Sequence, residues 1–236
     1  MTNKYNKQSY HKTIAISHGS GGISKTEVKI SEFFIEKGFQ VQIFDHFSSL
    51  RIKKLNWGYS RGLIDNHDVS LLNLVRTIDA EQCLSKYHLG LSLGGYIGLN
   101  NTNLFERIFC CYPGILPILK AQFMVNINRI RIFEGTNDMW TKLPPYLRKL
   151  FKLGQVYSIP QAYHSFMSFN KNKNCEVYSY KFKELLVCEE TLSKIQLKHS
   201  SLAKNGTSKK IISKNKTDQN GIKIVLNNII NEVTSG

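Results

Sequence analysis

Residues 90–95 read GLSLGG, and the G-x-S-x-G motif formed by Gly90, Ser92 and Gly94 is the stretch that most constrains the fold. A short apolar run, YHL (87–89), precedes the motif, and another, YIGL (96–99), follows it. This pattern is typical of a sharp strand-to-helix turn that exposes a serine hydroxyl above a sheet, because small residues on both sides let strand and helix approach closely. The motif also arises by chance in about one chain of this length in ten, so its neighbours decide its meaning.

Apolar runs of strand length alternate with helical patterns on both sides of this motif. We predict strands at 13–17, 39–45, 87–92, 107–113, 129–135 and 155–160, and helices at 25–38, 69–84, 93–101 and 144–151. Helix 25–38, for example, carries Val28, Ile30 and Phe34 at helical spacing and stops at Gly38. Strands separated by helices predict an α/β fold with a mostly parallel sheet that is flanked by helices on both faces.

The length and the C-terminal third bear on domain organisation. With 236 residues the chain is long enough for one domain with a substantial core, and we expect 1–236 to form a single domain. Periodicity weakens from about residue 170, which predicts a basic, irregular insertion at about 172–217. A closing amphipathic helix is expected at 218–233, with apolar residues on one side: Ile222, Val225, Leu226, Ile229 and Ile230.

The charge is strongly basic, with 32 Lys and Arg against 17 Asp and Glu and a net charge of +15. Such an excess can indicate a nucleic-acid or anionic-membrane partner. The densest basic stretch, 204–216, lacks interleaved aromatic residues that could stack on bases, and the other lysines are scattered. We therefore expect a solvated basic surface, a small-molecule substrate and no specific nucleic-acid partner; the oligomeric state is not indicated.

Composition also bears on location and cofactors. No apolar run approaches the roughly 18 residues of a membrane span, and the polar start MTNKYNKQSYHK lacks the apolar core of a secretory signal. The five cysteines form an odd set without C-x-x-C spacing, namely Cys83, Cys110, Cys111, Cys175 and Cys188. We expect free thiols in a reducing, cytoplasmic compartment, no metal site and no cofactor.

The glycine-rich turn after the first strand allows two interpretations. GSGGISKT (19–26) is one residue short of the phosphate-binding pattern G-x-x-x-x-G-K-[ST]; Ser24 stands in place of the second glycine, before Lys25, and Asp45 follows the next strand. Alternatively the turn supplies half of an oxyanion hole. In hydrolases with a G-x-S-x-G turn one N–H comes from the residue after the serine, here Leu93, and another from an earlier loop, here Ser20 or Gly21.

A nucleophilic Ser92 needs a general base and an acid that orients it, expected in the chain order Ser, Asp or Glu, His. His164 follows the strand at 155–160, whereas His199 lies in the irregular segment. Of the carboxylates between Ser92 and His164, Asp138 lies just past the end of a strand, while Glu134 lies within it. Ser92, Asp138 and His164 then meet at one edge of a parallel sheet, where ligands bind in α/β folds.

Taken together, these motifs resemble the dienelactone hydrolase family of the α/β hydrolases over about residues 13–169. The matching pieces are ISHGSGG, FDHFSS, RTIDA, GLSLGG, CYPG, EGTNDMWT and IPQAYHSF. The resemblance implies an α/β-hydrolase fold with Ser92 as nucleophile, Asp138 as acid and His164 as base. The enzyme that names the family has a cysteine nucleophile, so the serine here is nearer to relatives of broad esterase type.

The sequence therefore predicts a serine hydrolase that cleaves carboxylic esters or lactones through an acyl-enzyme. Arg61 and Arg76, ahead of the elbow, are candidates for binding a substrate carboxylate, because a guanidinium grips a carboxylate with two hydrogen bonds. Two alternatives stay open: a catalytically silent α/β-hydrolase scaffold that binds a partner, and a P-loop-like nucleotide-binding protein that depends on Lys25.

Overall fold

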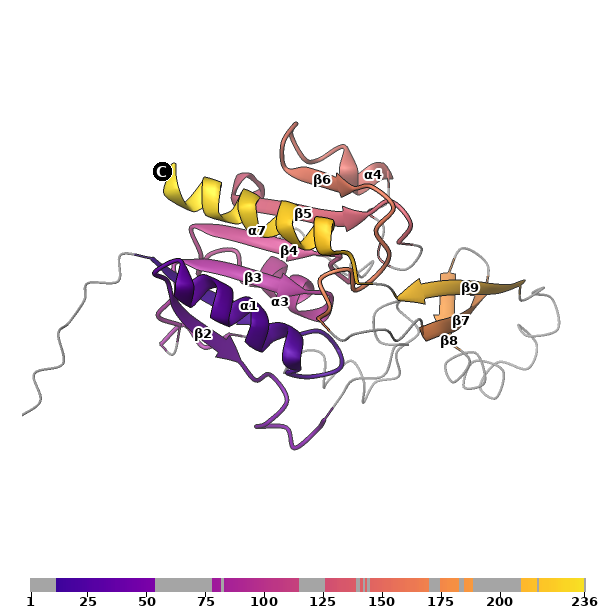
Figure 1. Cartoon of the computed structure of the whole chain (residues 1–236), viewed down its shortest axis with the longest axis horizontal. Coiled ribbons are helices and arrows are strands. Elements are labelled where there is room, and N and C mark those ends of the chain that lie inside the picture. Colours follow the sequence, from indigo (N-terminus) through magenta and orange to yellow (C-terminus); the bar gives the residue numbers. More distant parts are fainter. Residues whose placement is uncertain are drawn as a thin grey trace, which may run out of the picture.

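The computed structural model describes residues 12–53, 78–81, 83–114, 126–138, 141, 143, 145–169, 175–182, 185–188, 209–215 and 217–235. Its central element is a sheet of six parallel strands in the order β2-β1-β3-β4-β5-β6 (Figure 1). The strands are β1 (Thr13–Ser17), β2 (Gln40–Phe44), β3 (Tyr87–Leu91), β4 (Arg107–Cys111), β5 (Ile130–Gly135) and β6 (Val156–Ile159). All six predicted strands and the parallel sheet are confirmed.

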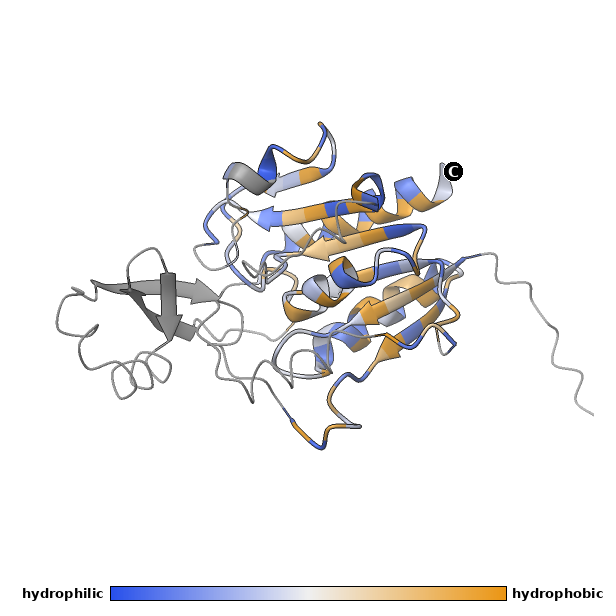
Figure 2. Cartoon of the chain, turned by 180° about the vertical axis from the view of Figure 1, so that it is seen from behind, coloured by the Kyte–Doolittle hydropathy of each residue, from blue (hydrophilic) through white to orange (hydrophobic). Residues whose placement is uncertain are grey.

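Helices cover both faces of this sheet. α1 (Lys25–Glu36) and α7 (Gln219–Thr234) lie over the face seen in Figure 1, and α3 (Leu93–Asn100) lies over the face seen in Figure 2. The short α4 (Pro145–Arg148) precedes β6. Successive strand residues alternate between two core clusters: in β4, for example, Phe109 joins the α1 and α7 side and Ile108 the α3 side. Burial on both faces explains the nearly continuous apolar strands.

The ends of α1 follow directly from its sequence. Ser24 is the N-cap and forms a capping box with Glu27, so two backbone N–H groups of the first turn are satisfied. Gly38 has a φ of +81° and its N–H donates to the carbonyl of Ile35. This left-handed turn after the helix is the glycine termination that the sequence predicted.

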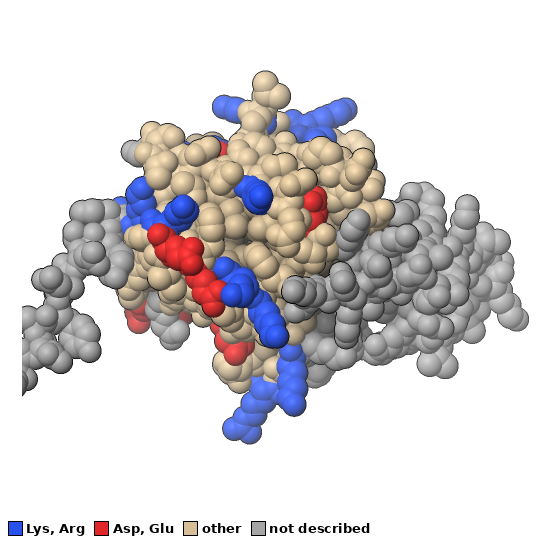
Figure 3. All heavy atoms as spheres, viewed as in Figure 1, with Lys and Arg blue, Asp and Glu red and all other residues tan. Residues whose placement is uncertain are grey.

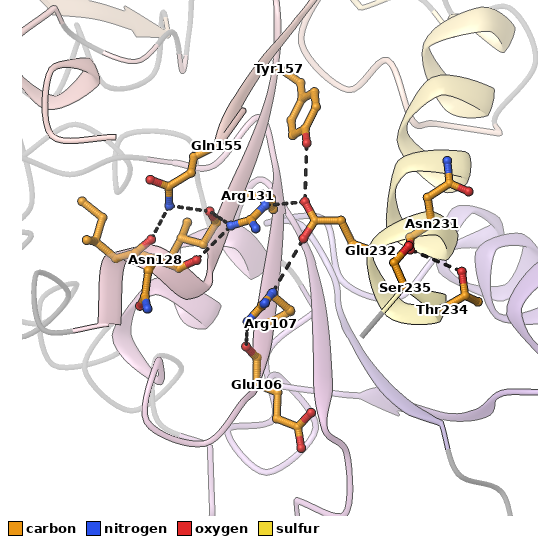
Figure 4. A network of polar contacts seen from close by, with 12 residues as sticks. Glu106, Arg107, Asn128, Arg131, Gln155, Tyr157, Asn231, Glu232, Thr234 and Ser235 are labelled. Atoms are coloured by element: carbon orange, nitrogen blue, oxygen red, sulfur yellow. Dashed lines mark hydrogen bonds and ion pairs between the residues drawn. The ribbon is translucent and has the colours of Figure 1, made fainter. Parts of the chain in front are cut away.

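The C-terminal helix α7 closes one face of the sheet, as predicted. Its N-cap Asp218 accepts from the N–H of Asn220, and its apolar side reaches the core through Ile222, Val225, Leu226, Ile229 and Val233. Near its other end, Glu232 accepts hydrogen bonds from Arg131 and Tyr157 and lies 3.6 Å from Nε of Arg107 (Figure 4). Glu232 thus ties the helix to three strands near their amino ends.

The predicted helix at 69–84 is wrong at its C-terminal end. Residues 69–77 lie outside the described residues, but 78–81 are not helical, and 80–81 form a turn. The carboxylate of Asp79 accepts from the N–H of Glu81, and the N–H of Ile78 donates to the side chain of Asn101. An aspartate that bonds the backbone two residues on favours a turn over a helix, which periodicity alone does not reveal.

Within the segment expected to be irregular, the structure has a second, antiparallel sheet in the order β8-β7-β9. Its strands are β7 (Cys175–Phe182), β8 (Leu185–Cys188) and β9 (Lys209–Asn215). The segment therefore carries regular structure that weak apolar periodicity did not predict.

The described residues also bear on surface charge, on the state of the cysteines and on membrane spans. On the face shown in Figure 3, described Lys and Arg side chains are scattered among Asp and Glu and form no continuous basic patch. Cys83, Cys110 and Cys111 carry free thiols, the last two fully buried. Within the described residues no helix is long and apolar enough to cross a membrane.

Candidate active site

The turn between β3 and α3 has the geometry that the G-x-S-x-G motif predicts. Ser92 adopts φ 51° and ψ −106°, an unusual conformation for a residue with a Cβ. A Cβ on Gly90 would lie 2.2 Å from the carbonyl oxygen of Gly94, and one on Gly94 would lie 2.1 Å from that of Ser17. Both positions exclude any side chain, so the glycines are what allows β3, α3 and the end of β1 to meet at Ser92.

Three sequence-predicted residues meet at this turn. The hydroxyl of Ser92 lies 3.3 Å from Nε2 of His164, and Nδ1 of His164 lies 3.0 Å from Oδ2 of Asp138. Asp138 and His164 are almost completely buried, with exposed fractions of 1% and 4%. They come from the loops after β5 and β6, so three carboxyl ends of parallel strands deliver one hydrogen-bonded chain.

Thr141, which the sequence did not single out, completes this chain. Its hydroxyl donates to Oδ2 of Asp138 at 2.6 Å, its N–H donates to Oδ1 at 3.0 Å, and its Oγ1 lies 3.2 Å from Nδ1 of His164. The available signal was spacing alone: a threonine three residues after an aspartate in a loop can bond back to it.

The protonation of this chain follows from its partners. Burial by itself raises the pKa of Asp138, but the His164 ring and the hydrogen bonds from His164 and Thr141 outweigh it and lower the pKa to about 2. An ionised carboxylate only accepts hydrogen bonds, so Nδ1 of His164 carries the proton. Nε2 then accepts the hydrogen bond from the hydroxyl of Ser92.

A pocket of about 290 Å³ opens in front of Ser92 and His164. It lies where the strand order reverses, because β2 is on one side of β1 and β3 on the other, and such switch points bind ligands in parallel sheets. Ser20 and Gly21 line the pocket in a tight turn in which the N–H of Gly22 donates to the carbonyl of Gly19. Leu93 is the first residue of α3, where backbone N–H groups lack helical partners.

Strained backbone is concentrated around this pocket. Ser92, Tyr112 and Ser165 line it, and all three are non-glycine residues with positive φ, at 51°, 40° and 60°. Only two other described non-glycine residues have positive φ, Arg51 and Gln161. Such conformations cluster at functional sites, where the surrounding structure holds them.

A network of histidines, which the sequence did not predict, holds the glycine-rich turn after β1. His18 accepts from the N–H of His46 at Nε2, and its Nδ1 donates to the carbonyl of Gly19 at 2.7 Å. Ser17 lies between His46 and His88, with its hydroxyl 2.9 and 2.8 Å from their Nε2 atoms. These contacts fix the residues that lead into the turn.

His46 and His88, the two histidines that contact Ser17, are neutral at physiological pH. Burial, and then neighbouring His18, lowers the pKa of His46 to about 3; burial, and then His46, lowers that of His88 to about 3. Nδ1 of His88 has no hydrogen-bond partner in the described residues and packs close to Gly98. His88 therefore carries its proton on Nε2, donates it to Ser17, and Ser17 donates in turn to His46.

Glu134, the rival acid, occupies a different environment. It is 1% exposed, and its carboxylate pairs with Arg148 and accepts from the N–H of Leu143 and the hydroxyl of Ser158. Its contacts are to α4, the loop before α4 and β6. It supports the packing beside the loop of Asp138.

The geometry of residues 19–26 disfavours the phosphate-loop alternative. Ser24 N and Oγ both donate to Oε2 of Glu27, so this carboxylate occupies the start of α1 where a phosphate would bind. Arg61 and Arg76, predicted as possible carboxylate ligands, lie outside the described residues.

Comparison with known proteins supports the fold. No protein-family model and no curated protein matches this chain. Among solved structures, a dienelactone hydrolase-like promiscuous phosphotriesterase from metagenomic libraries aligns over 95% of this chain and 86% of its own, with 13% identity and a TM-score of 0.52. A serine hydrolase of Xanthomonas campestris described as lacking a lid aligns over 64% and 72%, with 19% identity and a TM-score of 0.38.

The chain therefore has the α/β-hydrolase fold, as the resemblance implied. Identities this low bear on the fold alone, and the chemistry rests on the geometry of the site.

Proposed function

We propose that this chain is a serine hydrolase that cleaves carboxylic esters or lactones, with Ser92 as nucleophile, His164 as general base and Asp138 as the orienting acid. The observation that carries the proposal is the continuous hydrogen-bonded chain from Ser92 through His164 to Asp138 at the mouth of a pocket. The order and strand-end positions agree with those of α/β hydrolases.

In the first half of the reaction, Nε2 of His164 removes the Ser92 proton as Oγ attacks the acyl carbon. The carbonyl oxygen becomes negative and is stabilised by N–H groups of Leu93 and of Ser20 or Gly21. The imidazolium, stabilised by Asp138, then gives its proton to the leaving alkoxide, and the acyl group stays on Ser92.

In the second half, His164 takes a proton from water as the water attacks the acyl-enzyme. The bond to Ser92 Oγ breaks, Oγ recovers a proton from His164, and the carboxylic acid leaves. A lactone follows the same steps, with the alcohol remaining part of the product. The reaction uses only these side chains, the backbone N–H groups and water.

We also place the chain with serine-bearing relatives of the dienelactone hydrolase family and in the cytoplasm. The GLSLGG, CYPG and AYHSF motifs support the family, and free thiols at Cys83, Cys110 and Cys111 suit a reducing compartment. We further propose that 172–217 is an insertion in one domain.

A fluorophosphonate probe tests the proposal, because it phosphonylates only an activated serine. We expect the wild-type protein to be labelled and to hydrolyse p-nitrophenyl esters, and Ser92→Ala to lose both while staying folded by circular dichroism. Ser48→Ala, an exposed loop serine, is the matched control and should retain both. Labelling at another residue, or full esterase activity in Ser92→Ala, would overturn the proposal. A wild-type protein that is neither labelled nor active would also overturn it and would favour the silent scaffold.

A further inference from the structure

Glu27 is a buried carboxylate in the same pocket as Ser92 and His164. Its exposed fraction is 3%, although it belongs to the first turn of a surface helix, where a capping glutamate usually stays in water. It lines the pocket together with Ser24, and the hydrogen bonds from the N–H and the hydroxyl of Ser24 both go to Oε2.

No cation compensates this carboxylate among the described residues that line the pocket, which include no Lys or Arg. A buried charge without a counter-ion is unfavourable unless a partner reaches it. The cap itself does not require the charge, since a glutamine at this position makes the same capping box. The capping role therefore does not explain why a carboxylate, rather than an amide, lines this pocket.

An aromatic ring lines the pocket that Glu27 and His164 share. Tyr112 lines the pocket, and its ring packs edge-on against that of His164 with centroids 4.9 Å apart. Burial, and then the charges of Cys111, Glu27 and Asp138, raise the pKa of Tyr112, which places Glu27 within electrostatic range of this ring. A carboxylate beside an aromatic ring is the combination that recognises ammonium groups.

We propose that the pocket selects esters that carry a cationic ammonium group on the acyl chain, bound between the Glu27 carboxylate and the Tyr112 ring while the ester carbonyl lies at Ser92. This deepens the proposed hydrolase function and rests on it. It also reverses the expectation attached to Arg61 and Arg76, since the described part of the pocket would repel a substrate carboxylate. Glu27 is a specificity residue here and takes no part in proton transfer.

Three p-nitrophenyl esters of similar size test the selection. They are the trimethylammoniobutanoate ester, its neutral isostere with a tert-butyl group, and the glutarate half-ester with a free carboxylate. We expect wild-type kcat/KM to be about tenfold higher for the cation than for the isostere, and lowest for the anion. Glu27→Gln should remove the cationic preference and raise kcat/KM for the anion relative to that for the neutral ester.

Glu32→Gln is the matched control, because Glu32 lies on the same helix, is exposed and pairs with Lys29. It changes the net charge equally and should leave all three ratios unchanged. If Glu27→Gln alters the three esters by the same factor, Glu27 is a capping residue only and the inference is wrong. Neutral-ester hydrolysis that depends on Ser92 would still support the hydrolase function in that case.

A binding measurement tests the selection even if no ester is turned over. In Ser92→Ala, calorimetry with the methyl esters of the cation and its isostere should show tighter binding of the cation by about tenfold. The double variant with Glu27→Gln should lose that difference. Equal affinities for the two esters in Ser92→Ala would overturn the inference independently of catalysis.

Discussion

Ser92 is held in a conformation that residues with a Cβ avoid, and this strain is part of how the hydroxyl is presented. Its N–H donates to the carbonyl of Cys111, and its own carbonyl accepts from Gly114 and Tyr96, so three backbone hydrogen bonds fix the turn. Strain at such positions is of the order of 1–3 kcal/mol. The molecule gives up stability at the residue that the proposed reaction depends on.

Replacing Ser92 by glycine should therefore abolish activity but give a more stable protein than replacing it by alanine. Glycine tolerates φ 51° and ψ −106° without a Cβ, so we expect the free energy of unfolding of Ser92→Gly to exceed that of Ser92→Ala by about 1 kcal/mol. Urea denaturation of the two variants measures it. Equal stability, or a less stable glycine variant, would show that the turn is unstrained.

Asp138 and Glu134 are both buried carboxylates, but only Asp138 contacts His164. Asp138→Asn keeps the shape and favours the wrong imidazole tautomer, so kcat should fall by about 10⁴-fold. Glu134→Gln should change kcat by less than about threefold, because its partners are structural. Steady-state kinetics on a p-nitrophenyl ester compares the two variants, and the opposite ranking would mean that the acid is misassigned.

At the scale of elements, the Glu232 cluster joins the end of α7 to strands β4, β5 and β6 (Figure 4). Glu232 and Arg131 are mostly buried, with side-chain exposures of 22% and 15%, so their ion pair is less screened than a surface pair. Burial, and then the Glu232 carboxylate, raises the pKa of Tyr157. The cluster lies at the amino ends of these strands, whereas the pocket lies at the carboxyl ends of the sheet.

Glu232→Gln should lower the free energy of unfolding by about 1–2 kcal/mol without changing kcat, because it removes a partly buried charge pair away from the pocket. Glu106→Gln serves as control, since Glu106 pairs with Lys86 at 3.7 Å and both are more than half exposed. That variant should be neutral within about 0.5 kcal/mol. A loss of activity in Glu232→Gln at full stability would contradict this separation.

Elements were predictable from sequence where local signals decide them. The strand of apolar residues before Ser92, the glycine after α1 and the stripe on α7 each specify their own element. The juxtaposition of Ser92, Asp138 and His164 followed from strand order alone. The helix expected through Ile78 failed because one Asx turn decides that region.

Other features depend on contacts between distant residues, which no single stretch of sequence reports. The hydroxyl of Thr141 lies between two groups from different loops. Glu27 lines one pocket together with Ser92 and His164, which lie far from it in the sequence. Antiparallel pairing of β7 with β9 joins residues 28 to 40 positions apart, from Lys181 with Lys209 to Cys175 with Asn215, beyond the reach of periodicity.

For the molecule as a whole, the neutral histidines predict acid sensitivity. His46 and His88 have pKa values of about 3 in the fold and about 6.5 when unfolded, so the unfolded state binds more protons between these values. Stability should be complete above pH 6.5 and fall as the pH decreases, by up to about 1.4 kcal/mol per pH unit for each histidine. Asp138, whose pKa is lowered to about 2, adds a loss only below about pH 4.

Urea denaturation between pH 7.5 and pH 4.5 measures this slope. His88→Gln keeps a polar group near Nε2 but does not titrate, so its stability should depend less steeply on pH than that of the wild type. The comparison uses the slopes, because the variant can be less stable at every pH. Parallel curves would show that His88 is not held neutral by the fold.

The second sheet is separate from the first in its hydrogen bonding. If 172–217 is an insertion in one domain, limited proteolysis should cut there first and leave a nicked protein that a fluorophosphonate still labels at Ser92. Mass spectrometry locates the cuts. Loss of labelling on the first cut would instead make this segment part of the pocket.

The position of α7 has a consequence for the order in which the chain is made. A ribosome completes Ser92, Asp138 and His164 long before residues 219–234, which cover the same face of the sheet as α1. Until those residues emerge, Phe133, Ile159 and Phe166 lack the apolar cover that α7 supplies. A nascent chain can thus contain every residue of the proposed triad and still expose apolar surface. We expect chaperones to bind the chain at this late stage of synthesis.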